Sequence, residues 1–272
     1  LSQFHMDIAS SIQKVTEDIV LKIVRSLKEE FNKKNLCLAG GVALNCVANG
    51  KIKKENLFEK IFIQPAAGDA GGSLGAALAF WHIELNKDRI DKNKDEDFMK
   101  GSYLGPSFSD NEIKKIFDSL GSVYESFTPD EIIEKTAKLL ANGKSCGWFQ
   151  GKMEFGPRAL GNRSILADPR SELTQKNLNL KIKYRESFRP FAPSIMLEKV
   201  SDWFDYDGIS PYMLMVANIK TDKQLKITEE EKLFFGIEKL NIKRSQIPAV
   251  THVDYSARIQ TVDEKNNSLY YK

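Results

Sequence analysis

The sequence predicts an α/β protein of two domains, and three observations support this. A chain of 272 residues, 42% of them hydrophobic, is long enough for about two globular domains. Between residues 36 and 81, short apolar runs alternate with helical segments, which is typical of a parallel α/β layer. Beyond residue 100, strand-like runs are numerous and long helices are few, which indicates an α+β domain.

The first expected element is a helix over residues 8–31. Its apolar side chains recur at steps of three and four residues, which predicts an amphipathic helix with one buried stripe. The stripe comprises Ile8, Ile12, Val15, Ile19, Ile23, Leu27 and Phe31. A buried strand over residues 36–39 follows, and it ends at Gly40-Gly41.

The next elements complete the expected layer. Residues 42–49 are compatible with a helix, and residues 61–63 predict a second buried strand that Pro65 ends. A loop of small residues, 66–72, leads into an apolar helix over residues 74–81.

Residues 86–100 are dominated by Lys, Asp, Asn and Glu, so we expect a solvated linker there. This stretch is the candidate boundary between a first domain, residues 1–100, and a second domain, residues 101–272.

The second domain is expected to begin its main helix at a capping box. Thr128 is the N-cap, Pro129 opens the first turn, and Glu131 stands at the position that returns a hydrogen bond to the cap. Gly143 is a natural stop. Strands are expected over residues 146–149, 164–167, 191–197, 212–219 and 257–262. The charged stretch 220–232 is expected to be a mobile loop.

Composition excludes several classes of protein. Forty Lys and Arg residues oppose 37 Asp and Glu residues, so the formal net charge is +3, which excludes a basic nucleic-acid coat protein and an acidic disordered protein. The three cysteines form no CxxC pair, which favours a reducing, cytoplasmic compartment. No apolar stretch approaches the roughly 20 residues that span a bilayer, so we expect no membrane contact. Because the chain starts at Leu1 and ends within an expected element, we interpret it as a piece of a longer protein.

Two glycine-rich turns are candidate binding loops. Gly40 and Gly41 lie between a strand and a helix, where backbone N–H groups can approach a phosphate or a ribose; a purely structural turn has about equal weight. Asp69 is the one carboxylate in a loop of small residues, where it could hold a divalent cation or simply cap the next helix. Ser73 lies in a formal match to the hydrolase nucleophile elbow, but no strand directly precedes it.

Positive charge is concentrated between residues 144 and 189. This span holds ten basic and four acidic residues, a net charge of +6 against +3 for the whole chain. Several of its arginines are flanked by Gly, Pro and Phe, which restrict the backbone and favour a fixed guanidinium suited to phosphate or carboxylate. The alternatives are a basic surface face, ion pairs through Glu154 and Glu186, or a nucleic-acid site. The compact cluster and the near-neutral chain favour a small polyanion.

Five motifs together resemble the ATP-dependent O-carbamoyltransferases, the family of nodulation-factor, aminoglycoside and cephem carbamoyltransferases. They are LAGGVALN (38–45), PAAGDAGGSLGAAL (65–78), GWFQGKMEFGPRALGNRSILADPR (147–170), KYRESFRPFAPS (183–194) and THVDYSARIQTV (251–262). The resemblance covers nearly the whole chain outside its linkers.

The resemblance implies an architecture and a reaction. Residues 1–100 would be the C-terminal portion of an actin-like ATPase-superfamily domain, and residues 101–272 a YrdC-like adenylate-forming domain. In the family, carbamoyl phosphate and ATP yield a carbamoyladenylate, whose carbamoyl group passes to the hydroxyl of a small-molecule acceptor beside a divalent metal, iron or magnesium. A homodimer is one option for the assembly.

The resemblance also assigns roles to single residues. It implies catalytic roles for Arg158, Arg163, Lys183, Arg185 and His252; nucleotide-binding roles for Gly40, Gly41, Asn45, Lys152, Arg189 and Arg258; and a metal-ligand role for Asp69. The family's metal-binding histidines and its closing Asn-Thr-Ser-Phe-Asn stretch are expected outside residues 1–272, which leaves the metal site incomplete. Tyr255-Ser256 stands where the family has Gly-Thr, a change that could alter the turn beside His252. The competing interpretation is a non-catalytic nucleotide- or RNA-binding module of the same architecture.

Overall fold

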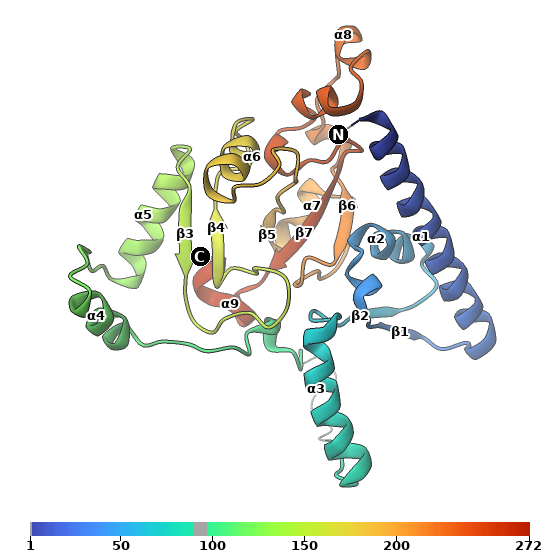
Figure 1. Cartoon of the computed structure of the whole chain (residues 1–272), viewed down its shortest axis with the longest axis horizontal. Coiled ribbons are helices and arrows are strands. Elements are labelled where there is room, and N and C mark those ends of the chain that lie inside the picture. Colours follow the sequence, from blue (N-terminus) through green and yellow to red (C-terminus); the bar gives the residue numbers. More distant parts are fainter. Residues whose placement is uncertain (1, 90–96) are drawn as a thin grey trace.

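The computed structural model describes residues 2–89 and 97–272, a mixed α/β arrangement with three small sheets in this part of the chain (Figure 1). The α/β class expected from the sequence is confirmed. Residues 90–96, the centre of the expected linker, lie outside the described residues. Within the two described ranges, no helix combines the length and the apolarity that a bilayer crossing requires.

The first part of the chain forms a strand–helix–strand unit. β1 (Asn35–Leu38) pairs in parallel with β2 (Lys60–Ile63), and α2 (Cys46–Glu55) connects the two strands. α1 (Gln3–Phe31) packs beside α2. The buried cluster between these elements consists of Val24, Leu36, Ile52 and Phe58. The expected alternation of strands and helices is confirmed here, since a parallel pair needs such a crossover.

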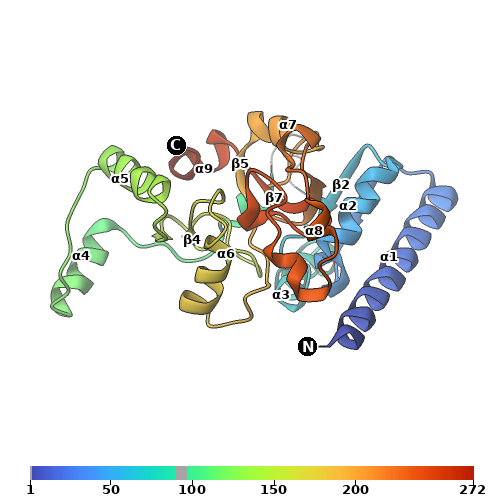
Figure 2. The ribbon, with the colours of Figure 1, turned by 90° about the horizontal axis from the view of Figure 1, so that it is seen from above.

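The helix α1 is confirmed, but the prediction that its apolar stripe is buried is wrong. The seven stripe residues from Ile8 to Phe31 are each 38–62% exposed, and α1 stands along one edge of the molecule (Figure 2). Its buried residues are Glu17 and Val24 instead. The reason is a polar network on the face toward α2, where Lys51 and Gln13 both donate to the carboxylate of Glu17. A buried carboxylate is retained only where such partners satisfy it.

Replacing Glu17 with Gln is expected to make the protein less sensitive to acid. Burial alone would raise the pKa of Glu17, but hydrogen bonds from Lys51 and Gln13 outweigh it and lower the pKa below its ordinary value of 4.5. The stabilisation is therefore present above pH 4.5 and is lost as the pH falls through the lowered pKa. The melting temperature of the wild type should fall more between pH 7 and pH 3.5 than that of Glu17→Gln. Glu29→Gln, on the exposed face of α1, should keep the wild-type pH dependence.

Beyond β2, α3 (Asp69–Ala79) and the π-helical turn Phe80–Glu84 extend away from the rest of the molecule (Figure 1). The helix expected over residues 74–81 is confirmed. Ser73 lies inside α3, and its hydroxyl donates to the carbonyl of Ala70 at 2.8 Å. A nucleophile elbow needs its serine on a turn that directly follows a strand, so the hydrolase interpretation is wrong.

The second part of the chain contains two sheets. β3 (Cys146–Phe149) pairs antiparallel with β4 (Arg163–Leu166). In the other sheet β7 (Ser256–Val262) is central, with β5 (Ser194–Met196) parallel to it on one side and β6 (Met215–Asn218) antiparallel on the other. Each of these strands falls on a run that the sequence predicts to be a strand.

The helices of this part are α4 (Asp110–Ser119), α5 (Pro129–Ala141), α6 (Thr174–Asn177), α7 (Val200–Trp203), α8 (Glu229–Lys232) and α9 (Glu264–Tyr271). α5 starts at the predicted capping box, in which Thr128 and Glu131 bond reciprocally. α4 was not expected, although Ser109 and Glu112 form a capping box of the same kind.

The expectation of a loop over residues 220–232 is corrected in part, and its mobility stays a prediction. The segment contains a short 3₁₀ helix (Thr221–Lys223) and then α8. Its backbone is bonded to a second segment, since the amide of Leu225 donates to the carbonyl of Arg244 at 2.7 Å. The amide of Gln246 donates back to Lys223 at 3.1 Å. Charged side chains here face outward while the backbone is paired, so composition alone misjudges the segment.

One core is shared by the residues before and after the expected linker. Its buried members include Ala43, Ile63 and Ala67 from the first part and Leu160 and Met215 from the second. α2 lies directly against β6, and the side-chain amide of Asn49 in α2 donates to the carbonyl of Leu214 at 3.0 Å. The division at residue 100, and the actin-like and YrdC-like identities of the parts, stay predictions.

A Gly50→Ala substitution in α2 should destabilise the protein, although alanine favours helices. A Cβ on Gly50 would lie 2.7 Å from the carbonyl oxygen of Val216 in β6, and a backbone atom cannot move aside. We expect the free energy of unfolding to fall by about 1–3 kcal/mol. The control is Gly75→Ala in α3, where a Cβ meets nothing within 4 Å. This substitution should raise the free energy of unfolding by about 0.5–1 kcal/mol, because alanine favours the helix over glycine. Urea unfolding followed by circular dichroism measures both, and equal midpoints would contradict the contact.

Candidate functional site

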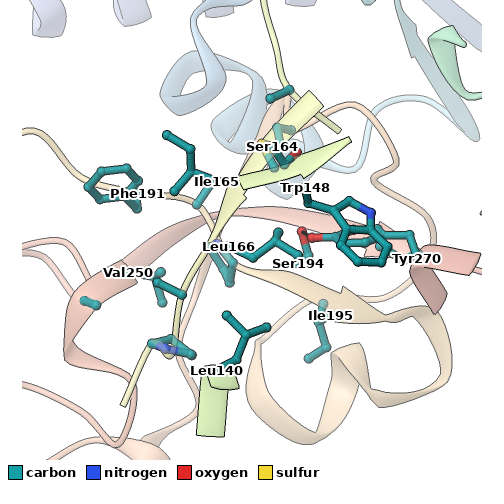
Figure 3. A pocket seen from close by; sticks show the side chains of 18 of the residues that line it. Leu140, Trp148, Ser164, Ile165, Leu166, Phe191, Ser194, Ile195, Val250 and Tyr270 are labelled. Carbon is teal, nitrogen blue, oxygen red and sulfur yellow. Dashed lines mark hydrogen bonds between the residues drawn. The ribbon is translucent and has the colours of Figure 1, made fainter. Parts of the chain in front are cut away.

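The main cavity of the described residues has a volume of about 890 Å³ and lies among β3, β4, β5, α5 and the segment 183–193 (Figure 3). Six cationic side chains that the sequence singled out line it: Arg158, Arg163, Lys183, Arg185, Arg189 and Arg258. An apolar region completes the lining. It includes Leu140, Trp148, Ile195, Val250 and Tyr270. The structure therefore brings together basic residues from three separate segments of the chain.

Three of the arginines raise the positive potential of the cavity jointly. Burial lowers the pKa of Arg258, and the positive charges of Arg158 and then Arg185 lower it further. The Nε of Arg158 is buried without a hydrogen-bond partner among the described residues. Four of the lining cations form no ion pair with a carboxylate of the described residues. They are Arg158, Lys183, Arg185 and Arg258. Arg158, Arg185 and Arg258 are half-buried, and Lys183 is exposed. A cluster of like charges without carboxylate partners is the arrangement that an anionic ligand stabilises.

Arg185 is held by its own surroundings. Its Nε donates to the side-chain oxygen of Asn179 at 2.7 Å, and its guanidinium lies 5.2 Å from the ring of Phe191. Asn179 is fully buried and also donates to the carbonyls of Ser187 and Arg189. The guanidinium is thereby fixed by neutral groups, which leaves its charge uncompensated.

Arg163 lines the cavity, but its N–H groups are used inside the protein. They donate to the backbone carbonyls of Gln150, Asn162, Gly151 and Pro106 at 2.5–3.3 Å. The guanidinium also lies over the ring of Phe149 at 3.5 Å. This arrangement ties β4 to the loops around it, so the geometry favours a structural contribution over the catalytic role that the resemblance implied.

Arg189 differs from the other cations of the cavity. Its Nε pairs with the carboxylate of Glu186 at 3.0 Å, and both side chains are about half exposed. The alternative of internal ion pairs thus applies to Arg189. It does not apply to Glu154, whose carboxylate bonds only to backbone amides among the described residues.

His252 does not line the cavity. The hydroxyl of Ser256 donates its proton to the carboxylate of Asp254 at 2.7 Å. The Nδ1 of His252 lies 3.0 Å from the hydroxyl oxygen of Ser256, which can therefore only accept, so Nδ1 carries the proton of the ring. Its Nε2 is then an unprotonated nitrogen, buried and without a partner among the described residues. Burial lowers the pKa of His252, which keeps the ring neutral at pH 7. Tyr255 has a φ of 61°, in the left-handed region that glycine occupies without strain.

The remaining predicted nucleotide contacts lie outside the cavity. Lys152 is exposed, and its carbonyl accepts from the side chain of Asn162 at 2.7 Å. The side chain of Asn45 caps α2 by accepting from the amide of Ala48 at 3.1 Å. It also pairs with Gln13 of α1, so its polar atoms are engaged within the protein.

Gly40 and Gly41 border open space, since a Cβ on either would meet nothing within 4 Å. Gly40 has a φ of 95°, and its amide donates to the carbonyl of Ala67 at 2.8 Å. The Nη2 of Arg158 lies 3.5 Å from the carbonyl of Leu44. The Gly40–Leu44 turn of the first part is therefore in contact with a cation of the cavity.

Asp69 is exposed at the first turn of α3. Within residues 2–89 and 97–272, no group of three or more His, Cys, Asp or Glu side chains could hold a metal ion. Asp69 alone does not fit a divalent metal, which needs several ligands.

The apolar part of the lining was not expected from the sequence. Figure 3 shows Trp148 beside Tyr270 and Ser194, and the hydroxyl of Tyr270 donates to that of Ser194 at 2.9 Å. Trp148 is 9% exposed, and its indole N–H has no partner in the described part of the chain. The run Cys146–Phe149 predicted the strand that carries Trp148, but no local signal indicates which face of this strand meets a cavity.

Comparisons with known proteins match both parts of the chain to the same family. The family model for the carbamoyltransferase C-terminus matches residues 137–272, and that for the carbamoyltransferase N-terminus matches residues 2–78. An uncharacterised protein of Synechocystis sp. is 55% identical over 274 residues, which cover 100% of this chain and 44% of that protein. Nodulation protein NolO of Bradyrhizobium diazoefficiens is 37% identical over 99% of this chain and 45% of its own length. Nodulation protein U of Rhizobium fredii is 32% identical over 86% of this chain and 34% of its own length. The chain thus spans less than half the length of these relatives.

Proposed function

Because this chain belongs to the carbamoyltransferase family, we propose that it supplies the site where carbamoyl phosphate and ATP form a carbamoyladenylate. The carbamoyl group then passes to a hydroxyl group of a small-molecule acceptor. These relatives are more than twice as long as the chain, so the complete reaction is proposed for the longer protein.

The observation that carries this proposal is the convergence of four unpaired cations on one cavity. Arg158, Lys183, Arg185 and Arg258 come from three segments and have no carboxylate partner among the described residues. Carbamoyl phosphate and the triphosphate of ATP bring several negative charges that repel one another. Fixed guanidinium groups offset this repulsion and hold the reactants in line without reorganising during the reaction.

The proposed step needs positioning more than covalent help from the protein. Water first hydrolyses carbamoyl phosphate, whose bond between the carbamoyl group and the phosphate breaks to give carbamate and inorganic phosphate. A carbamate oxygen then attacks the α-phosphorus of ATP, the bond from this phosphorus to the oxygen that bridges the β-phosphate breaks, and pyrophosphate leaves. The arginines stabilise the charge that develops on the phosphate oxygens and on the leaving group. The apolar region around Leu140, Trp148 and Ile195 offers the surface that a purine ring prefers.

No step is assigned to a metal. Asp69 is the residue that the resemblance relates to an iron or magnesium site, but the described residues provide no further ligands near it. A complete metal site would need side chains from outside residues 2–89 and 97–272.

The test is a pyrophosphate-release assay on the full-length protein. Release should require both ATP and carbamoyl phosphate. Release that is independent of carbamoyl phosphate would overturn the proposal. Absence of release, together with salt-sensitive binding that prefers RNA over ATP, would support the nucleic-acid-binding alternative instead.

A further inference from the structure

A single buried carboxylate holds the loop that carries Arg158. Glu154 is 6% exposed, and its Oε1 accepts three backbone N–H groups. The donors are Leu160 at 2.7 Å, Asn162 at 2.9 Å and Arg163 at 3.2 Å. Arg158 lies midway along the sequence between the carboxylate and these amides. These hydrogen bonds close residues 154–163 into a loop. Its free stretch, residues 155–159, carries Arg158 and makes no hydrogen bond to the carboxylate of Glu154 among the described contacts.

We propose that Glu154 is the positioning residue for Arg158, an inference that rests on the proposed function. Three amides that converge on one point form a site for an anion. Here the carboxylate of Glu154 fills that site, so the amides of Leu160, Asn162 and Arg163 are not left for a substrate phosphate. The substrate anion meets the side chain of Arg158, and Glu154 fixes the backbone from which that side chain projects.

The negative charge of Glu154 is central to this role. Hydrogen bonds to an ionised acceptor are about twice as strong as those to a neutral one. No cation pairs with the carboxylate among the described residues, so the amide bonds are what offset its burial. A glutamine of the same shape keeps an oxygen in place but holds three donors more weakly.

Other contacts hold the same loop from outside and should preserve the fold when Glu154 is changed. The carbonyl of Leu160 accepts from the hydroxyl of Tyr103 and from the side-chain amide of Gln260, each at 2.8 Å. The carbonyl of Phe155 accepts from the hydroxyl of Ser102. Loss of the carboxylate should therefore loosen the free stretch around Arg158 without unfolding the sheet.

Three other cations of the cavity make no hydrogen bond to Glu154 among the described residues, unlike Arg163, whose amide does. Lys183, Arg185 and Arg258 lie on other segments, and none of them is bonded to the loop among the described contacts. Misplacing Arg158 should therefore lower turnover while the remaining cations still bind the triphosphate. This separates a positioning role from a general loss of the site.

The experiment uses the full-length protein with Glu154→Gln. Hydrogen–deuterium exchange at the amides of Leu160, Asn162 and Arg163 should speed up, with exchange in β7 unchanged. Pyrophosphate release should fall about tenfold in kcat, while the KM for ATP stays within about twofold. Exchange and turnover that both match the wild type would overturn the inference. If Glu154→Gln does not fold, Tyr103→Phe provides a milder test on Leu160, and it should raise exchange locally and lower kcat by a smaller factor.

A double-mutant cycle separates positioning from ordinary structural damage. In an Arg158→Lys background, Glu154→Gln should cause little further loss of turnover, because Glu154 acts through the guanidinium. An equal tenfold loss in both backgrounds would overturn the inference. Failure of the proposed function is distinct, because the wild type would then release pyrophosphate without carbamoyl phosphate or not at all. Exchange at the amides of Leu160, Asn162 and Arg163 would still test whether Glu154 holds the loop.

Discussion

Arg158→Ala is expected to lower carbamoyl-phosphate-dependent pyrophosphate release about a hundred- to a thousandfold. That is the usual effect of removing one preorganised donor from a site where charge develops. The melting temperature should change little, because the Nε of Arg158 has no hydrogen-bond partner in the ranges that the structure describes, and its Nη2 reaches the carbonyl of Leu44 only at 3.5 Å. Removing one of several neighbouring positive charges also relieves repulsion with Arg258. The measurement is steady-state release by the full-length variant, together with its thermal unfolding.

Arg170→Ala is the matched control. It removes the same charge from the same basic span, but Arg170 is 64% exposed, pairs with Asp168 and does not line the cavity. Its activity should stay within about twofold of the wild type, because an exposed charge outside the cavity contributes little. A large fall in melting temperature for Arg158→Ala, or equal activities for the two variants, would show that Arg158 is structural.

Gly161→Ala is expected to cost about 2–5 kcal/mol in the free energy of unfolding, from strain and overpacking together. Gly161 has a φ of 108°, a backbone angle that residues other than glycine rarely adopt. A Cβ there would lie 2.4 Å from Cδ1 of Tyr270. The ring of Tyr270 is not free to swing away, because its hydroxyl donates to Ser194. Urea unfolding measures the loss.

Two further variants separate the causes of that loss. Gly143 has a φ of 74°, but a Cβ there would meet nothing within 4 Å. Gly143→Ala should therefore lower the free energy of unfolding by the backbone strain alone, about 1–2 kcal/mol. Adding Tyr270→Ala to Gly161→Ala should restore part of the lost stability relative to Tyr270→Ala alone, because the clash is then absent. Additive losses would indicate that the contact with Tyr270 is not the cause.

Local patterns in the sequence were sufficient to locate the strands and the main helices. Short apolar runs bounded by glycine or proline, such as residues 36–39 and 61–63, became β1 and β2. The expectation that both strands are buried is wrong for most of their residues, since only Leu36 of β1 and Ile63 of β2 are buried. The same periodicity located α1 but assigned it the wrong face. Which face is covered depends on Lys51, which lies 34 residues from its partner Glu17, and no local pattern contains that information.

The candidate site divides in the same way. The basic motifs carry a family resemblance that is confirmed, and the structure brings Arg158, Arg185 and Arg258 to one cavity. Arg163 is of the same residue type and only five positions from Arg158, yet carbonyl oxygens from distant loops occupy its N–H groups. His252 belongs to the same motif as Arg258, but its side chain lies outside the cavity. These differences arise from tertiary packing, which residue type and spacing do not encode.

The packing of α2 against β6 has a consequence for how the molecule tolerates change. With Ala43, Ile63 and Ala67 in the same cluster as Leu160 and Met215, neither side can be exchanged for a foreign module without reshaping the other. Recombination between distant relatives at the charged linker should therefore yield poorly folded chimeras. Substitutions in the core residues on one side of the linker should therefore require compensating substitutions on the other side, because both sides pack in the same core.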